Sequence, residues 1–363
     1  MLQSSPLIQL YLVRLRDFYR QPARVFWVYG FPTLLAIALG FAFQNRPPAP
    51  VLVDLVQGPA ESRIKAALEE HNAALDRDHK AGKPRQNVPS VEIHEAPEEE
   101  ALKRLNTGRT PIVIVPLGTD TWSYRFDPTR PEASAARQTI DDILQRAANR
   151  HDPIQTKDEY VSEPGSRYID FLIPGLIGLN AMGGGLWGIG FLLVNFRIAK
   201  LLKRFVATPM PRSDFLLALL GARLTFVIPD LAVLLLLGKL MFQMPIRGNL
   251  ALVIGIELLG ALAFAGIGLL VACRVNTTEA VSGLMNLVML PMWLFSGVFF
   301  SSDRFPPAAQ PFIQALPLTQ LVGALRRVLL EGATLLDVGT SVLILAAWAV
   351  VTFVLALRFF RWT

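Results

Sequence analysis

The sequence predicts an α-helical integral membrane protein with six transmembrane helices in a 1 + 5 arrangement and an inserted extracytoplasmic α/β domain. Two observations lead to this prediction. Six stretches are apolar for long enough to cross a bilayer, which takes about 20 residues for roughly 30 Å of hydrocarbon. The composition, with 52% hydrophobic residues in a chain of 363, is too apolar for a soluble protein with buried helices.

The first apolar stretch is separated from the other five by a long polar region. Several arginines precede the first stretch, as they do in a secretory signal peptide, but its length of about 19 residues exceeds the usual apolar core of 7 to 15. We therefore expect an uncleaved signal anchor. The expected transmembrane helices are residues 25–43, 171–196, 219–242, 250–272, 281–300 and 340–357.

The distribution of lysine and arginine predicts the orientation, because short cationic loops are retained in the cytoplasm. Cations gather before the first span and between the second and third, which places both termini in the cytoplasm and the 358–363 tail with them. The net charge of +6 is attributed to topology and contact with the lipid bilayer, and no nucleic acid partner is expected. Five cations oppose this bias: Lys239, Arg247, Arg304, Arg326 and Arg327.

Residues 44–170 are expected to form the extracytoplasmic α/β domain, because short β-type runs alternate with helix-type runs. Residues 76–89 are polar and rich in breakers, and are interpreted as a mobile loop. Cys273 is the single cysteine, so no intramolecular disulfide is available. Strands are predicted at 51–56, 91–94, 111–116 and 122–126, and helices at 62–71, 98–106 and 133–149.

Two further segments have patterns with alternative interpretations. Apolar and cationic residues interleave in residues 1–24, which predicts a cytoplasmic amphipathic elbow helix on the membrane surface; a frayed terminus is the alternative. The second span is rich in glycine, and Gly184 and Gly188 form a GxxxG pair. Such a pair favours close helix packing, either within the chain or with a second subunit.

The connection at residues 197–214 has apolar residues at helical spacing between cations, followed by two prolines. A short amphipathic helix closed by a rigid turn is suited to docking onto a partner. A basic loop that only sets the topology is the alternative. The later connection, residues 301–339, is too polar for one span and is broken by prolines, which predicts a re-entrant helical segment on the extracytoplasmic side.

Three segments resemble the membrane subunits of type-2 ABC exporters. They are RFVATPMPRSDFLLALLGARL at 204–224, GLLVACRVNTTEAVSGLMNLVMLPMWLFSGVFFSSDRFP at 268–306 and LPLTQLVGALRRVLL at 316–330. Their order and spacing match that family, although Ser301 and Ser302 replace a common proline. The resemblance implies an ABC type-2 exporter-like fold.

The resemblance also implies that the 197–214 segment is a coupling element for a separate ABC ATPase, present in two copies. No GxxxxGK[ST] occurs in the chain, so ATP and Mg²⁺ are expected on that partner and no cofactor or metal on this chain, which is not itself an enzyme. The expected setting is the bacterial inner membrane, with a second copy or a paralogous permease, and a periplasmic adaptor as a further candidate partner. The ATPase-coupling residues are Lys200, Lys203, Arg204, Phe205, Ala207, Thr208 and Pro209.

The implied function is export of a drug, lipid or other amphiphile from the cytoplasm or the inner leaflet. Ionisable residues are costly inside a membrane, so Asp230 and Glu257 are candidates for the translocation path, with a buried tie between helices as the alternative. Met289 and Trp293 are further candidates, with core packing as the alternative.

Two other classes of function compete with export. An intramembrane protease is disfavoured because neither a suitable aspartate motif nor HExxH occurs. A membrane-anchored receptor or assembly scaffold, with an extracytoplasmic ligand-binding domain, is the remaining alternative.

Overall fold

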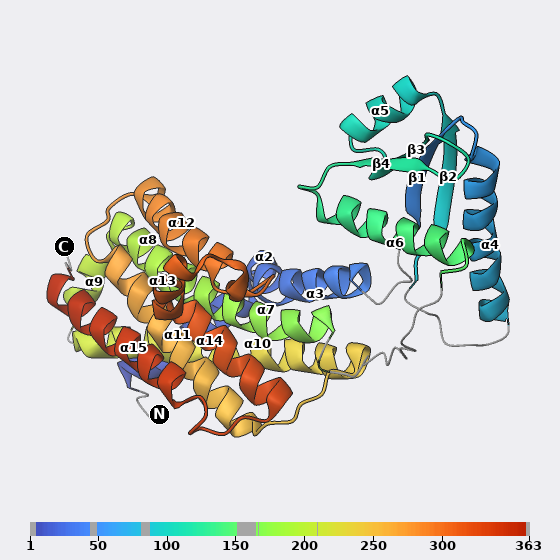
Figure 1. The fold of residues 1–363 in the computed structure, drawn as a ribbon. Helices are drawn as coiled ribbons and strands as arrows, with labels where there is room; N and C mark the ends of the chain where they lie inside the picture. The colour runs from blue at the N-terminus through green and yellow to red at the C-terminus, as the bar shows by residue number, and fades with distance from the viewer. Residues whose placement is uncertain are drawn as a thin grey trace. The chain divides into compact units, whose positions relative to one another are not determined.

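The structure is a computed structural model that describes residues 5–43, 49–80, 88–150, 165, 167–208 and 210–360. The chain forms two compact units, one comprising Met1–Gln44 with Val161–Thr363 and the other Asn45–Tyr160. The first unit is helical and the second contains a small mixed sheet (Figure 1). The predicted fold class, a helical membrane protein with an inserted α/β domain, is confirmed.

Within the described residues, six helical stretches are long and apolar enough to cross a membrane. The first combines α2 (Pro22–Val25), η1 (Phe26–Gly30) and α3 (Phe31–Ala42), and the second combines α7 (Tyr168–Gly185), η2 (Leu186–Phe191) and α8 (Leu192–Ile198). The other four are mostly single helices. They are α10 (Arg212–Phe242), which contains the candidate span Ser213–Phe242, α11 (Leu250–Ala272), α12 (Thr278–Phe295) and α15 (Gly339–Phe359).

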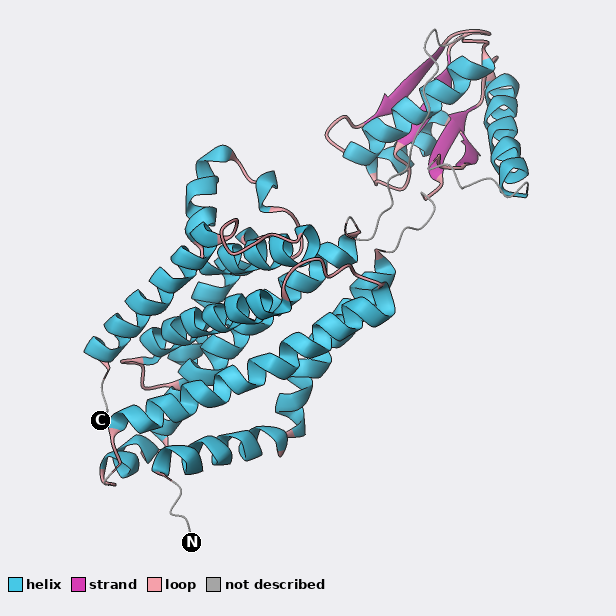
Figure 2. Cartoon of the chain, turned by 90° about the horizontal axis from the view of Figure 1, so that it is seen from below, coloured by secondary structure: helices cyan, strands magenta, loops and turns pink. Residues whose placement is uncertain are grey.

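Helix α11 packs against α7, η2, α10 and α15 and forms the centre of the helical unit. Figure 2 shows that this unit is built of helices joined by loops, whereas the strands belong to the other unit. Small residues allow its closest approach to the second span. A Cβ atom on Gly268 would lie 2.6 Å from the Gly185 carbonyl oxygen, and one on Gly190 would lie 2.5 Å from the Gly268 carbonyl oxygen. Neither position has room for a side chain, so the two backbones touch here, as small residues permit between membrane helices.

Two helix boundaries differ from those expected from hydropathy by more than the others. Helix α10 begins at Arg212 rather than at 219, because the polar residues before the apolar stretch continue the same helix. Helix α12 ends at Phe295 rather than at 300. Gly297 adopts φ +74°, a left-handed conformation that commonly follows the end of a helix.

The segment between α12 and α15 consists of short helical pieces, as its prolines predicted. They are η3 (Ser302–Arg304), η4 (Pro307–Ala309), α13 (Gln310–Ala315), α14 (Pro317–Arg326) and η5 (Arg327–Glu331). Helix α14 packs against α7, α11 and α15, and most of its side chains are buried. Its depth in a membrane remains a prediction.

The α/β unit contains a four-stranded sheet of order β2-β1-β3-β4. Strands β1 (Val51–Val56), β2 (Val91–Ala96) and β3 (Ile112–Pro116) are parallel, and β4 (Trp122–Phe126) pairs with β3 in the antiparallel sense. The two crossovers run in opposite directions along the sheet. Since such crossovers are right-handed, their helices cover opposite faces. Helices α4 (Glu61–Lys80) and α6 (Pro131–Ala147) share one core, and α5 (Glu98–Asn106) covers the other (Figure 1).

Helix α4 continues well past the expected end at residue 71, so the prediction of a mobile loop from residue 76 is wrong for 76–80. The breakers in that stretch, Gly82 and Pro84, come only after these helix-forming residues. Asn72 also fixes the helix to the sheet, because its side chain bonds to both the N–H and the C=O of Val91 at 2.8 and 2.7 Å. Residues 81–87 lie outside the described part of the chain.

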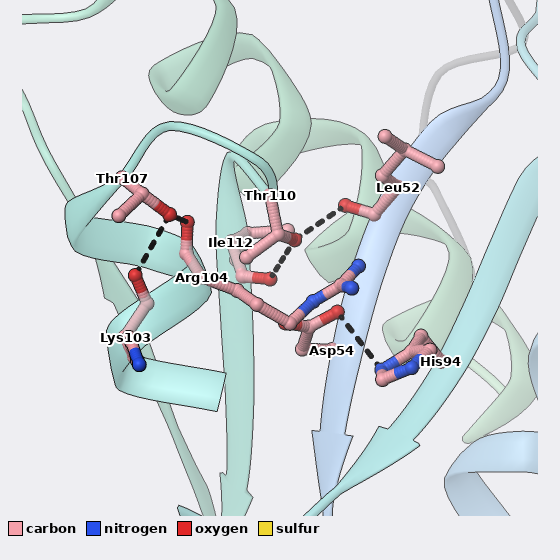
Figure 3. A network of polar contacts seen from close by, with 8 residues as sticks. All are labelled: Leu52, Asp54, His94, Lys103, Arg104, Thr107, Thr110 and Ile112. Atoms are coloured by element: carbon pink, nitrogen blue, oxygen red, sulfur yellow. Dashed lines mark hydrogen bonds and ion pairs between the residues drawn. The ribbon is translucent and has the colours of Figure 1, made fainter. Parts of the chain in front are cut away.

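A buried carboxylate on the α5 side of the sheet was not predicted. Asp54 on β1 is 0% exposed, and Arg104 of α5 donates from Nε to its Oδ2 at 2.8 Å (Figure 3). His94, paired with Asp54 in the strand register, places Nδ1 3.6 Å from Oδ1. A buried charge is tolerated when it is paired and hydrogen-bonded. Arg104 therefore holds α5 against the sheet.

Candidate functional site

A short helix, α9 (Leu201–Val206), lies between the second and third candidate spans and exposes its cations. Lys200 adopts φ +56°, a left-handed conformation that separates α9 from α8. Lys203 and Arg204 are exposed, whereas Leu202 is 1% exposed. The helix is thus attached to the unit by its apolar side and offers a cationic outer side.

Phe205 belongs to the inner side of this helix. Its ring centroid lies 5.1 Å from that of Phe215 on α10 and 6.2 Å from that of Phe196 on α8. The prediction grouped Phe205 with the residues that contact a partner. Its half-buried ring packs within this chain and so positions the helix, while its part in coupling stays a prediction.

The end of α9 is also exposed. Ala207 and Thr208 are exposed, and the Thr208 hydroxyl donates to the Phe205 carbonyl oxygen at 2.6 Å, which satisfies a carbonyl at the helix end. Pro209 lies outside the described residues. The outward surface of α9 is therefore defined by Lys200, Lys203, Arg204, Ala207 and Thr208.

Arg197 ties the base of α9 to the central helix. Its guanidinium donates to the carbonyl oxygens of Ala272, Cys273 and Val275 at 2.8, 3.1 and 2.5 Å. These carbonyls lie at the C-terminal end of α11, where they have no partner within the helix and where a cation is favoured by the helix dipole. Arg197 therefore links α8, the helix that precedes α9, to the end of α11.

A second feature is a group of buried polar side chains between α7, α10 and α11, here called the buried polar cluster. It consists of Asn180, Arg223, Asp230 and Glu257. The three charged members are 6%, 3% and 1% exposed, respectively. Asn180 donates to Asp230 at 2.8 Å through its side chain and accepts from Arg223 at 3.0 Å through its carbonyl oxygen. Arg223 also interacts electrostatically with both carboxylates.

The glycine pair of the second span accommodates this arginine. A Cβ atom on Gly184 would overlap the Arg223 guanidinium, and one on Gly188 would lie 3.9 Å from the Arg223 Cδ atom. The GxxxG pair was predicted to receive another helix. In this unit it receives a side chain, while the close backbone contact occurs at the neighbouring Gly185 and Gly190.

The geometry of the buried polar cluster favours an interhelical tie over a surface for cargo. Within the described part of the chain, Arg223 Nε and Glu257 Oε2 are buried without a hydrogen-bond partner. The three charged side chains are almost completely buried, so they cannot contact a cargo unless the helices separate. Their present contacts join α7 and α10.

The two candidates on α12 differ in exposure. Met289 is 8% exposed, and its sulfur accepts the Trp187 Nε1–H at 3.0 Å. Trp293 is 40% exposed. Helix α12 also exposes Leu287, Leu290 and Leu294. Only Trp293 of these two candidates is accessible to a molecule outside the unit.

The matching family model describes an ABC-2 family transporter protein and covers residues 23–358. The chain belongs to the ABC-2 transporter family. Members of this family are the transmembrane components of ABC transporters. These components are not themselves catalytic.

Curated relatives of this ABC-2 protein are transporters and permeases. It is 28% identical over 57% of its length to ABC transporter G family member 20 of Dictyostelium discoideum, covering 29% of that protein. It is 32% identical over 31% of its length to the linearmycin resistance permease protein LnrN of Bacillus subtilis, covering 30% of that protein. It is 25% identical over 54% of its length to the probable multidrug ABC transporter permease YbhS of Escherichia coli, covering 52% of it. The chain thus spans about half or less of these relatives.

Two arginines of this ABC-2 protein have structural roles that the sequence reasoning missed. Arg326 of α14 donates to the carbonyl oxygens of Phe171 and Gly297 at 2.9 and 2.5 Å, and its guanidinium stacks 3.4 Å from the centroid of the Phe171 ring. Arg167 donates to the Phe242 carbonyl oxygen at 2.5 Å, at the end of α10. From the sequence, Arg326 was treated as a charge opposing the expected orientation, and Arg167 was assigned no role. For Arg326 the sequence offered one signal, because this arginine lies in the 316–330 segment that carries the family resemblance.

Proposed function

We propose that this chain is the membrane-spanning permease subunit of an ATP-driven ABC exporter, powered by a separate ABC ATPase. The observation that carries the proposal is the outward surface of α9 in a chain of the ABC-2 family. This surface presents Lys200, Lys203 and Arg204, and it is attached through Arg197 to the central helix α11. A partner bound here could move the bundle without bending the connection.

The proposed orientation places both termini and α9 in the cytoplasm of a bacterial inner membrane, with the α/β unit outside. Six spans return the chain to the same side, and the cationic N-terminal segment agrees with the cationic connection around α9. Two of the five opposing cations have local partners. Arg326 binds backbone carbonyls, and Arg327 donates to the Asp337 carbonyl oxygen at 2.8 Å. These two cations are therefore accounted for by contacts within the chain.

The proposed cargo is a drug, lipid or other amphiphile. Two relatives support this class by their names, one as a linearmycin resistance permease and one as a probable multidrug permease. We place the path along the exposed face of α12, between this chain and a second copy or a paralogous permease. Trp293 can there contact an apolar cargo. Asp230 and Glu257 are not assigned to the resting path, since both are buried.

Copurification tests the proposed subunit. The full chain, extracted from its native membrane in mild detergent, is expected to bring down an ABC ATPase in equal amount, and the complex should hydrolyse MgATP. Because such an ATPase is cytoplasmic, its binding through α9 also tests the orientation. Recovery of the chain without an ATPase, and without ATP turnover, would instead favour the receptor or scaffold function.

Substitution Trp293→Ala tests the proposed path. Loss of one aromatic contact, worth about 1 kcal/mol, is expected to reduce export on the order of fivefold for cargoes that bind there. The measurement is drug susceptibility of a deletion strain that carries each variant at equal expression. Trp27→Ala is the matched control, because Trp27 is 63% exposed but belongs to the first span. Equal effects of the two substitutions would contradict the assignment of α12 to the path.

A further inference from the structure

The N-terminal helix α1 (Pro6–Tyr19) has one side that packs against the helical unit. The Tyr11 hydroxyl and the Thr225 hydroxyl form a hydrogen bond of 2.8 Å, and the Phe18 ring stacks on Phe226 at 4.0 Å between centroids. Thr225 and Phe226 lie inside the candidate span Ser213–Phe242. The packed side of α1 is therefore fixed to a membrane helix, well inside its apolar length.

The opposite side of α1, here called the outer arc, is exposed although it is largely apolar. Ile8, Leu12, Val13 and Tyr19 are 47%, 41%, 57% and 56% exposed. At 100° per residue, Arg16 and Arg20 lie in the middle of this arc, between Leu12 on one side and Val13 on the other. The two arginines are four residues apart, so their side chains are neighbours on one face. Both are exposed.

The acidic residue of this region is already used by other cations. Asp17 receives the Arg24 guanidinium at 3.1 Å and the Gln21 amide at 2.8 Å, and Arg14 lies 3.6 Å from the same carboxylate. Arg16 and Arg20 have no ion-pair partner among the residues that the structure describes. Two neighbouring guanidinium groups surrounded by exposed apolar side chains are thus left without an anion.

We propose that the outer arc binds an anionic phospholipid, with Arg16 and Arg20 on its phosphate and the apolar side chains among its acyl chains. A guanidinium binds phosphate through paired hydrogen bonds, and an amphipathic helix with such a face lies at the boundary of headgroups and acyl chains. Only Gln21 separates the C-cap Arg20 from the first span, Pro22–Ala42, so the arc cannot leave the membrane surface. A soluble anion would satisfy the arginines but would not use the apolar side chains that surround them.

Native mass spectrometry of the full chain in detergent, titrated with phosphatidylglycerol, tests this proposal. Each cation near an anionic membrane surface contributes about 1 kcal/mol, so R16Q combined with R20Q is expected to weaken phosphatidylglycerol binding roughly 30-fold. Binding of zwitterionic phosphatidylcholine should not change. The matched control is R146Q with R150Q on the α/β unit, which removes the same charge at the same spacing and should bind phosphatidylglycerol like the wild type.

Three outcomes would overturn the lipid assignment. The first is unchanged phosphatidylglycerol binding by the R16Q/R20Q variant, or an equal loss in the control. The second is complete displacement of the lipid by inorganic phosphate, which would show that acyl chains contribute nothing. The third is loss of the ATPase or of a second copy from the purified complex while lipid binding persists, which would make the outer arc a protein contact. None of these outcomes depends on the cargo.

Discussion

Reversing the two exposed cations of α9, with Lys203→Glu and Arg204→Glu together, is expected to abolish export while the permease still folds. Both side chains are exposed and have no ion pair or side-chain hydrogen bond with the residues that the structure describes, so the substitutions remove no such contact. Like charges placed opposite each other at an interface cost several kcal/mol. A loss of about 4 kcal/mol corresponds to roughly 1000-fold weaker binding of an acidic ATPase surface. Copurified ATPase and ATP-dependent transport should both fall to background.

The matched control is Lys239→Glu with Arg247→Glu. These residues are also exposed cations, but they lie at the other end of α10 and in the connection that follows it. The control carries the same change of charge and should keep the ATPase and its activity. Wild-type copurification and transport in the α9 variant would show that this helix is not the coupling element. An equal loss in the control would point to net charge instead of a surface on α9.

Replacing Asp230 by leucine is expected to destabilise the permease strongly. The substitution removes the acceptor for Asn180 and leaves the buried guanidinium of Arg223 with only Glu257 for compensation. Breaking a buried charge pair typically costs about 3 to 5 kcal/mol, whereas one neutral hydrogen bond between membrane helices averages about 0.6 kcal/mol. The loss of charge compensation therefore dominates. The midpoint of thermal unfolding, followed by size-exclusion chromatography, should fall on the order of 10 °C.

Two further variants separate a structural tie from a transport role. Asp230→Asn keeps an acceptor oxygen for Asn180 and the side-chain size but removes the charge, so a tie should lose nearly as much stability as in Asp230→Leu, with export falling only in proportion to the folded protein. Adding Arg223→Met to Asp230→Leu removes the uncompensated cation and should recover part of the lost stability. A fully assembled Asp230→Asn variant without export would contradict the tie and return Asp230 to the translocation path.

The helices of the membrane unit could largely be predicted from the sequence because a span is recognised by local hydropathy and length. The exact ends of these helices could not be predicted in this way. Helix α12 stops at Phe295 because Gly297 turns into the left-handed region and its carbonyl accepts from Arg326, which is distant in sequence. In the α/β unit, helix α4 extends to Lys80 through residues that are polar but include no glycine or proline. The prediction ended this helix where the sequence becomes polar, although polar residues can continue a helix.

The candidate site was predicted in part. Helical spacing and the following prolines identified α9, and the exposed Lys203 and Arg204 agree with an outward cationic side. Phe205 was grouped with the coupling residues, and its ring contacts were not predicted, because its aromatic partners come from α8 and α10 and cannot be seen in the local pattern. The glycine pair was recognised as a site of close approach. That the approaching group is the Arg223 side chain depends on how α7 and α10 pack.

The sequence alone determined the six membrane-crossing stretches, the inserted α/β domain and the cationic connection, since each depends on residues close together in the chain. Only the tertiary structure decided which buried polar groups meet. Asp230 accepts a hydrogen bond from Asn180, Asp54 accepts one from Arg104, and Arg197 donates to a carbonyl at the end of α11. The physical reason is that burial makes an unpaired charge or carbonyl costly, yet the partner that removes this cost can come from any element the fold brings near.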